Sequence, residues 1–368
     1  MRVAMFTLLT EKNAASRAFG YQFAPRLRAA GVPTAIYPPS PVRIFELLCE
    51  GRLLSAPRKA LYWYGIVLPV RLWQIARACR CDVIFIQRGI FRYNARPLLE
   101  SLLCFLARRL HGASVVYHID DALYLHTDAR HFQRRIAMAD MVLTGNTELA
   151  EYARRWNANV VTFEGALDLA YYTPLTRRDG DGVVIGWAGT EPASVADMPA
   201  VMARMPRDLD VRFRIVGPEG ARRVWGPRIE HRRWSLEREV ENLSSFDIGV
   251  MPLADTAYNR AKEGFKLKQY MAVGIPVVAS PVGKNLELVQ HGVNGFFART
   301  EQEWAQMLAL LAGDRDLCRR MGEAGRRFVE ERYSLDDAAP RLLEILRGVA
   351  SARTGAGGCR RCTAGPRP

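Results

Sequence analysis

The sequence predicts an α/β protein built from two doubly wound, Rossmann-like domains that face each other across a central cleft. Short apolar or β-branched runs alternate with longer helical patterns, the rhythm of βαβ units and a parallel sheet. The 368 residues, 49% hydrophobic and 24% charged, suffice for two domains of ordinary size. This composition excludes a wholly disordered or collagenous chain.

The first domain is expected over residues 1–168. Its predicted strands are Arg2–Thr10, Val32–Tyr37, Val83–Gln87, Ser114–His118, Met141–Thr144 and Val160–Glu164. The sequence then becomes polar and rich in turn residues, with Pro174, Asp179 and Gly180, so residues 169–182 are predicted to be a linker.

A second parallel sheet is expected over residues 183–333. Its predicted strands are Val183–Trp187, Val211–Val216, Ile229–Glu230, Ile248–Pro252, Val277–Ser280 and Gly295–Ala298. Residues 334–350 should form a last helix, near 335–349. Residues 351–368 are rich in glycine and arginine and are predicted to be a disordered tail.

The net charge of +14 indicates a face that attracts phosphate, whether in lipid headgroups, nucleotides or nucleic acid. Lysine is scarce beside arginine, yet three lysines, 262, 266 and 268, fall within seven residues. Such clustering either arises by chance or supplies compact point charges for a local task.

The seven cysteines lack the paired spacing of a metal site, which indicates reduced thiols in a cytosolic compartment. Residues 1–9 are predicted to be a strand and not a secretory signal. The longest uncharged apolar stretch, Ala60–Val70, is shorter than the about 20 residues that span a bilayer.

Two stretches of the second domain fit a diphosphate. Residues 184–190 (Val-Ile-Gly-Trp-Ala-Gly-Thr) run from a strand into a turn whose glycines let a ligand approach the backbone, although a packing glycine explains them equally well. Residues 246–295 carry Lys-Glu-Gly-Phe-Lys-Leu-Lys-Gln-Tyr-Met-Ala from 262, then Gly-Ile-Pro-Val-Val-Ala-Ser from 274. The chain has neither a dinucleotide-binding nor a P-loop fingerprint.

This order of motifs resembles the nucleotide-sugar site of GT-B glycosyltransferases, in the large retaining family often called group 1 or family 4. The likeness is firm across roughly Val183–Tyr333 and weaker in the first domain, at Asp120-Asp121-Ala122 and Thr144-Gly145-Asn146. It implies a sugar nucleotide held mainly by the second domain and an acceptor held by the first. It also implies that the last helix crosses back to the first domain.

The resemblance assigns the donor site to residues at strand ends and on one helix. Lys262 and Lys266 would neutralise the diphosphate, with Lys266 the catalytic cation. The alternative is that Lys262 and Lys268 are solvated charges on the helix face, which is the expected interpretation for Lys268. Gln269 stands where the family usually carries a ribose-binding glutamate, and Ala261 where it carries a second one. The remaining donor-side candidates are Gly189, Thr190, Gly217, Trp234, Leu236 and Leu267.

Asp120 and Asp121 are the catalytic candidates of the first domain, because one of them could act as a base or bind the sugar. His118 and Arg88 are acceptor-side candidates. Each has an ordinary alternative: His118 a satisfied core residue, Asp121 a helix cap, and Arg88 a surface or salt-bridge residue. Asp208-Leu209-Asp210 formally matches a metal motif but precedes a strand, so we expect no metal and no cofactor beyond the donor substrate.

Residues 58–80 combine an apolar stripe with arginines, tryptophans and tyrosines. This pattern predicts either an interfacial element for an anionic membrane or an ordinary packing helix.

The expected function is metal-independent transfer of a sugar, with retention of configuration, to a glycan or lipid-linked acceptor at the inner membrane face. The alternatives are a noncatalytic sugar-nucleotide or glycan-binding subunit and a nucleic-acid-binding protein. The latter rests on charge alone, so no nucleic-acid partner is expected.

Overall fold

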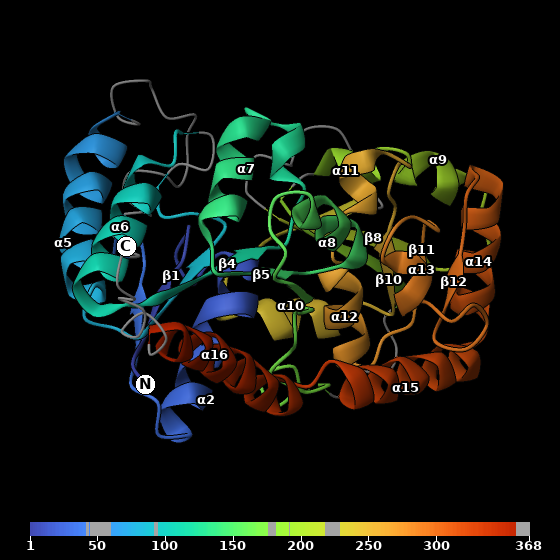
Figure 1. The fold of residues 1–368 in the computed structure, drawn as a ribbon. Coiled ribbons are helices and arrows are strands. Elements are labelled where there is room, and N and C mark those ends of the chain that lie inside the picture. Colours follow the sequence, from blue (N-terminus) through green and yellow to red (C-terminus); the bar gives the residue numbers. More distant parts are fainter. Residues whose placement is uncertain are drawn as a thin grey trace, which may run out of the picture. The chain divides into compact units, whose positions relative to one another are not determined.

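The computed structural model describes residues 1–41, 44, 60–91, 95–175, 182–190, 192–217 and 229–357 (Figure 1). The chain divides into two compact units. Unit 1 comprises Met1–Glu164 together with the residues from Asp336 onward, and unit 2 comprises Gly165–Leu335. Each unit contains one parallel six-stranded sheet, as predicted.

The sheet of unit 1 has the order β2-β1-β3-β4-β5-β6, and all of its strands are parallel. The strands are β1 (Val3–Phe6), β2 (Thr34–Tyr37), β3 (Val83–Gln87), β4 (Ser114–Ile119), β5 (Met141–Thr144) and β6 (Val160–Thr162). Strands β1, β3 and β4 are buried along their whole length, so their apolar runs lie in the core.

Helices connect these strands. They are α1 (Ala14–Ser16), η1 (Arg17–Tyr21), α2 (Phe23–Ala29), η2 (Leu61–Val67), α5 (Leu68–Ala78), α6 (Leu98–His111), η3 (Leu123–Leu125), α7 (Ala129–Met138), α8 (Thr147–Arg154) and α16 (Leu335–Gly357). Side chains cap several of them, as when Asn146 Oδ1 accepts the N–H of Leu149 at the start of α8.

Unit 2 has the strand order β12-β11-β10-β7-β8-β9, again parallel throughout. Its strands are β7 (Val183–Ala188), β8 (Val211–Gly217), β9 (Ile229–Arg233), β10 (Ile248–Met251), β11 (Val277–Ala279) and β12 (Gly295–Phe297). Its helices are η4 (Pro192–Val195), α9 (Met198–Ala203), α10 (Glu239–Ser244), α11 (Ala257–Arg260), α12 (Phe265–Ala272), α13 (Asn285–Leu288), α14 (Glu301–Gly313) and α15 (Arg315–Arg332).

Strand order reverses once in each sheet, between β1 and β3 in unit 1 and between β7 and β10 in unit 2. In open parallel sheets, ligands bind where the order reverses, beyond the carboxyl ends of the strands. The residues that follow β1, β3, β7 and β10 are therefore the ones to examine for a site.

Several boundaries differ from the sequence predictions, among them that of the second unit, which begins at Gly165 and includes the described part of the predicted linker. Residues 2–10 form a strand only at Val3–Phe6, because Thr7 and Leu8 already belong to the loop at the strand's carboxyl end. The last helix continues to Gly357, past the predicted end near Val349, so part of the predicted tail is helical. Residues 358–368 and the cysteines at 49, 359 and 362 lie outside the described residues.

The last helix belongs to unit 1. Ser114 Oγ, at the start of β4, donates a hydrogen bond to the carbonyl oxygen of Val349 at 3.0 Å. Arg341 Nη2 donates to the carbonyl oxygen of Thr162 in β6 at 3.2 Å. The chain thus returns to its first unit after completing the second.

Candidate functional site

The carboxyl end of β7 brings Lys266 against Gly189, which itself packs closely against Gly217. Lys266 Nζ lies 4.3 Å from the centroid of the buried Trp187 ring, the last residue but one of β7. A Cβ on Gly189 would collide with Lys266 Nζ and with the Trp187 ring. A Cβ on Gly217, at the end of β8, would lie 2.7 Å from the carbonyl oxygen of Gly189. Three predicted donor-side residues therefore meet here, and both glycine positions exclude a side chain.

Helix α12 places Lys266 in its first turn. The helix begins after Gly264, whose φ of +69° is a left-handed conformation that favours glycine. Deeper in the helix, Tyr270 is fully buried and its Oη accepts the N–H of Ala188 at 2.9 Å. Burial raises the pKa of Tyr270 well above its usual range. This hydrogen bond joins α12 to the end of β7, which fixes the strand end relative to Lys266.

Lys268 is not the solvated charge that was predicted. It is completely buried, and its Nζ lies 3.1 Å from Glu263 Oε1 and 3.0 Å from the carbonyl oxygen of Gly165. Its ammonium also lies 4.2 Å from the centroid of the Tyr333 ring. Glu263 accepts the N–H of Gly165 as well, so this ion pair anchors the start of unit 2. Lys268 is structural and faces away from solvent.

Gln269 and Trp234 belong to one hydrogen-bonded chain. Gln269 Nε2 donates to Tyr172 Oη at 2.8 Å, and Tyr172 Oη donates to Glu239 Oε2 at 2.9 Å. Trp234 Nε1 donates to the other carboxylate oxygen of Glu239 at 3.3 Å. Sequence reasoning missed Tyr172 and Glu239. The only signal was a pair of tyrosines in a stretch predicted to be a linker.

The remaining donor-side candidates lie around this core. The N–H of Trp234 donates to the carbonyl oxygen of Gly217 at 3.1 Å, and the carbonyl oxygen of Leu236 accepts from Tyr171 Oη at 2.9 Å. Lys262 Nζ lies 5.1 Å from the centroid of the Tyr258 ring. Thr190 is exposed after Gly189, whereas Leu267 is fully buried in α12. Leu267 therefore packs in the core and can touch no donor through its side chain.

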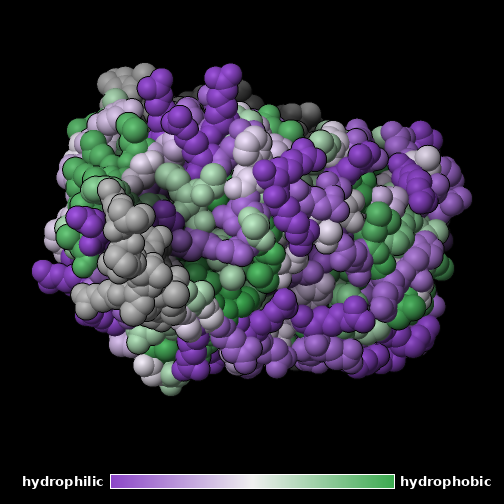
Figure 2. All heavy atoms as spheres, in the orientation of Figure 1, coloured by the Kyte–Doolittle hydropathy of each residue, from purple (hydrophilic) through white to green (hydrophobic). Residues whose placement is uncertain are grey.

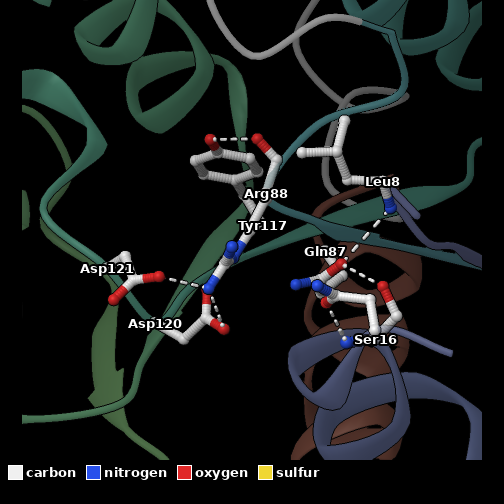
Figure 3. Close-up of polar contacts among 8 residues, drawn as sticks. Leu8, Ser16, Gln87, Arg88, Tyr117, Asp120 and Asp121 are labelled. Carbon is white, nitrogen blue, oxygen red and sulfur yellow. Dashed lines mark hydrogen bonds and ion pairs between the residues drawn. The ribbon is translucent and has the colours of Figure 1, made fainter. Parts of the chain in front are cut away.

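Unit 1 holds a compact ionic cluster at the carboxyl ends of β3 and β4 (Figure 3). Arg88 Nε lies 2.5 Å from Asp120 Oδ1, and Arg88 Nη2 contacts both Asp120 Oδ2, at 2.9 Å, and Asp121 Oδ2. Tyr117 Oη donates to the carbonyl oxygen of Arg88 at 2.9 Å. The salt-bridge alternative for Arg88 is thus the observed one, and both predicted catalytic carboxylates are oriented by it.

The backbone of Arg88 has a φ of +61°, the one left-handed non-glycine residue in the described part of the chain. Such a conformation costs roughly 1 kcal/mol for a residue with a side chain. Three ionic contacts offset this cost and hold the guanidinium between the two aspartates. Strained residues of this kind concentrate at functional sites.

Gln87 fixes the other side of the same strand end. Its Oε1 accepts the N–H of Leu8 at 3.2 Å and the hydroxyl of Ser16 at 3.4 Å (Figure 3). Because Leu8 follows β1 and Gln87 ends β3, these contacts bridge the point where the strand order of unit 1 reverses. The point where the strand order reverses is therefore polar, and hydrogen bonds within unit 1 hold its loops in place.

His118 is a core residue and not an acceptor-side group. It is completely buried between the rings of Phe19 and Phe85, at centroid distances of 4.0 and 5.8 Å. Burial lowers the pKa of His118 to about 4. Neither ring nitrogen has a hydrogen-bond partner among the residues that the structure describes.

Asp208 and Asp210 stand just before β8, at the amino end of the strand, as expected for a turn. Asp210 packs under Gly182, where a Cβ would lie 2.5 Å from its Oδ2. Within the described ranges, no group of three or more His, Cys, Asp or Glu side chains could hold a metal ion.

Residues 194–314, which lie within unit 2, match the sequence profile of the family described as "Glycosyl transferases group 1". The chain carries a group 1 glycosyltransferase domain on a GT-B fold. The resemblance and the fold class predicted from the sequence are both confirmed.

Two solved structures share this GT-B fold over nearly the whole chain. Sucrose-phosphate synthase from Thermosynechococcus elongatus aligns with a TM-score of 0.72 at 16% identity, covering 96% of this chain and 100% of that one. Anabaena HepE in complex with UDP and glucose aligns with a TM-score of 0.66 at 15% identity, covering 95% and 100%. At these identities the likeness establishes the fold alone.

A curated relative resembles part of this GT-B chain more closely in sequence. The GDP-mannose-dependent alpha-(1-6)-phosphatidylinositol monomannoside mannosyltransferase of Mycobacterium tuberculosis is 33% identical over 111 residues. The match spans 29% of each protein. It therefore bears on one segment and not on the whole relative.

Proposed function

We propose that the protein transfers a sugar from a nucleotide-diphosphate sugar to a hydroxyl group of a glycan or lipid-linked acceptor, with retention of anomeric configuration. The bond between C1 of the sugar and the diphosphate oxygen breaks. The acceptor oxygen bonds to C1 on the same face, and its proton passes to the departing diphosphate.

The observation that carries this proposal is the position of Lys266. Its ammonium lies beyond β7, in the first turn of α12, beside Gly189, where the packing leaves no room for a side chain. An anion at this point would meet a fixed positive charge and the positive end of the helix. Negative charge develops on the diphosphate as it leaves, so this placement stabilises the transition state more than the ground state.

In the proposed complex the nucleotide lies toward the chain formed by Gln269, Tyr172, Glu239 and Trp234. The Gln269 amide donates to Tyr172, which leaves its carbonyl oxygen to accept a ribose hydroxyl. The relatives support a nucleotide donor: HepE was solved with UDP and glucose, and the mannosyltransferase is GDP-mannose-dependent. They give no support to a noncatalytic subunit.

For unit 1 we propose that Asp120 and Asp121 hydrogen-bond the acceptor or the transferred sugar, with Arg88 as the positioning residue. The guanidinium fixes both carboxylates at the carboxyl edge of the sheet. Replacing Arg88 by alanine should lower kcat while leaving the affinity for UDP or GDP unchanged. Lost nucleotide affinity in this variant would contradict a role confined to unit 1.

We further propose that transfer needs no metal ion, because Lys266 supplies positive charge at the diphosphate. Turnover that persists in excess EDTA would support this, whereas loss of activity that Mg²⁺ or Mn²⁺ restores would contradict it. The two mechanisms differ in the residues they need, because a bound Mg²⁺ or Mn²⁺ needs a set of oxygen ligands and a lysine ammonium does not.

The relatives and the pattern of residues 58–80 also support a proposal for the acceptor and for the location of the protein. The mycobacterial relative's name specifies a phosphatidylinositol monomannoside, which supports a lipid-linked acceptor. A cytoplasmic protein attached peripherally through residues 58–80 would meet such an acceptor at the membrane surface. No helix in the described part of the chain is long and apolar enough to cross a bilayer.

The deciding experiment incubates the full chain with a panel of UDP and GDP sugars and follows thermal unfolding. A ligand that binds only the folded state raises Tm, by an amount set by its concentration relative to Kd. A shift with one donor, followed by transfer to lipid-linked or glycan acceptors and NMR of the product anomer, would establish the reaction. No shift with any donor would refute the proposal, and an inverted product would refute retention.

A further inference from the structure

Two neighbouring helical segments of unit 1 expose large apolar side chains to solvent. In η2 and α5 these are Leu61, Tyr64, Leu72 and Trp73, each at least 45% exposed. In α6 they are Leu98, Leu102, Phe105 and Leu110, each at least 38% exposed. We call these eight residues the η2–α6 face. Single exposed leucines are ordinary, but eight large groups on adjacent helices form a patch that calls for an occupant.

The two segments lie side by side and run in the same direction. Helices α5 and α6 are in contact, and they follow consecutive crossovers from β2 to β3 and from β3 to β4. Because all three strands are parallel, both helices run opposite to the strands. Figure 1 shows α5 and α6 adjacent at the left of the view, and Figure 2 shows hydrophobic side chains at its left edge, over α5.

The charges bordering this face are positive. Arg77 and Arg80 lie at the carboxyl end of α5, and Arg109 lies at the matching end of α6 beside Arg108, which is paired with Asp140 at 3.1 Å. Residues 60–80 contain no acidic side chain, and the one acid of α6, Glu100, is buried against Arg135 at 2.9 Å. The unbalanced charge of the face is therefore basic.

Arginine also borders the other end of α6. A groove of about 670 Å³ lies between α6 and α7, with Arg96, Arg130 and Arg134 in its lining beside Leu98. The apolar row from Leu98 to Leu110 is about 18 Å long at 1.5 Å per residue. Basic groups thus stand at both ends of an apolar strip, the arrangement of a helix that lies within a membrane interface.

We propose that the η2–α6 face docks onto an anionic lipid bilayer. Leu61, Leu98 and Phe105 would enter the region between headgroups and acyl chains, and Trp73 would sit at headgroup depth. The Arg77 guanidinium already lies 4.9 Å from the centroid of the Trp73 ring, so a lipid phosphate would meet both groups together. The arginines at the ends of α5 and α6 would supply the preference for anionic lipid.

Charge complementarity favours a bilayer over a second copy of the chain. A self-contact through this face would bury Arg77, Arg80 and Arg109, and neither residues 60–80 nor the exposed surface of α6 offers an acidic side chain to pair with them. An anionic lipid surface instead supplies phosphates along the whole border. The proposal extends the peripheral location from residues 58–80 to a surface that includes α6, and it does not depend on catalytic activity.

The test is co-sedimentation of the full chain with vesicles of phosphatidylcholine alone or mixed with phosphatidylglycerol. We expect binding to the mixed vesicles that weakens as salt rises. The double variant Trp73→Glu/Phe105→Glu should bind the vesicles at least about tenfold more weakly, since two large apolar groups no longer enter the interface. Arg80→Glu/Arg109→Glu should lose the preference for anionic vesicles.

Matched controls lie in unit 2. Leu310 on α14 is 45% exposed, as Leu72 is, and Arg320 is exposed on α15. Leu310→Glu/Arg320→Glu should bind vesicles like the unmodified protein. Equal losses in this control, or no vesicle binding by the unmodified protein, would overturn the proposal.

A second measurement separates a bilayer from a self-contact and from failure of the proposed function. If analytical centrifugation shows a dimer that Trp73→Glu/Phe105→Glu converts to monomer, the face is an interface between copies and the bilayer proposal is wrong. Donor-induced thermal shifts should be the same in every variant. Retained donor binding without vesicle binding would overturn the docking surface alone.

Discussion

The points where the strand order reverses carry different side chains in the two units. At the edge of unit 1, the charges satisfy one another: Arg88 contacts Asp120 and Asp121, and Gln87 braces the loop after β1. At the edge of unit 2, Lys266 lies over the Trp187 ring beside Gly189, where a Cβ would collide with both side chains. Under the proposed function, the first arrangement positions carboxylates and the second presents a cation to an anionic ligand. On that proposal, one topology supports two distinct chemical tasks.

Lys268 provides the sharpest contrast with Lys266, two residues away on the same helix. Replacing Lys268 by methionine should lower the free energy of unfolding by about 3–5 kcal/mol, because Glu263 is left buried without its partner. Urea denaturation measures this loss. The double variant Glu263→Gln/Lys268→Met should recover part of it. Normal stability with lost donor binding would mean that Lys268 contacts the donor.

Replacing Lys266 by alanine should have the opposite profile. We expect turnover to fall about 10²- to 10³-fold, the usual effect of removing one group that stabilises developing charge. Stability should change little, since the side chain is only partly buried. Steady-state kinetics beside thermal unfolding distinguishes the two lysines, and near-normal turnover would remove Lys266 from its proposed role.

His118 makes the comparison testable by pH. Burial holds its pKa at about 4 in the folded protein, below the ordinary value of 6.5. Between these values the unfolded chain binds a proton that the folded chain does not, so stability is full above pH 6.5 and decreases as pH falls. The loss should reach about 3 kcal/mol near pH 4. Urea denaturation of the protein and of His118→Phe, at pH 7 and pH 4, should show a smaller loss in the variant. Equal losses would contradict the core assignment.

The sequence was sufficient for the fold, because the fold depends on local patterns. Apolar runs of four to six residues marked most strands, and the Gly-x-x-Gly spacing around residues 186–189 marked the turn beside Lys266. Such runs and spacings are features of chain order, which a sequence displays directly.

Long-range pairings were not predictable in the same way. Lys268 and Lys266 look equivalent in sequence, and only the packing of Gly165 and Glu263 onto α12 buries one of them. Tyr172 reaches Gln269 across 97 positions of sequence. A strand-end histidine likewise gave no sign that two phenylalanine rings enclose it. Burial of polar groups is decided by tertiary contacts, which no local pattern encodes.

The smallest expected effect tests the chain of hydrogen bonds that links Gln269 to Trp234. Tyr172→Phe removes the hydroxyl between Gln269 Nε2 and Glu239 Oε2, leaving two buried polar atoms short of a partner, at a cost of about 1–2 kcal/mol. Affinity for UDP or GDP should fall as well if this chain orients the amide toward the ribose. The matched control is Tyr171→Phe, which removes the neighbouring hydroxyl that donates to the Leu236 carbonyl oxygen. Isothermal titration calorimetry of UDP or GDP with both variants measures this difference. Equal nucleotide affinity in the two variants would mean that the hydrogen bonds from Gln269 to Trp234 have only a structural role.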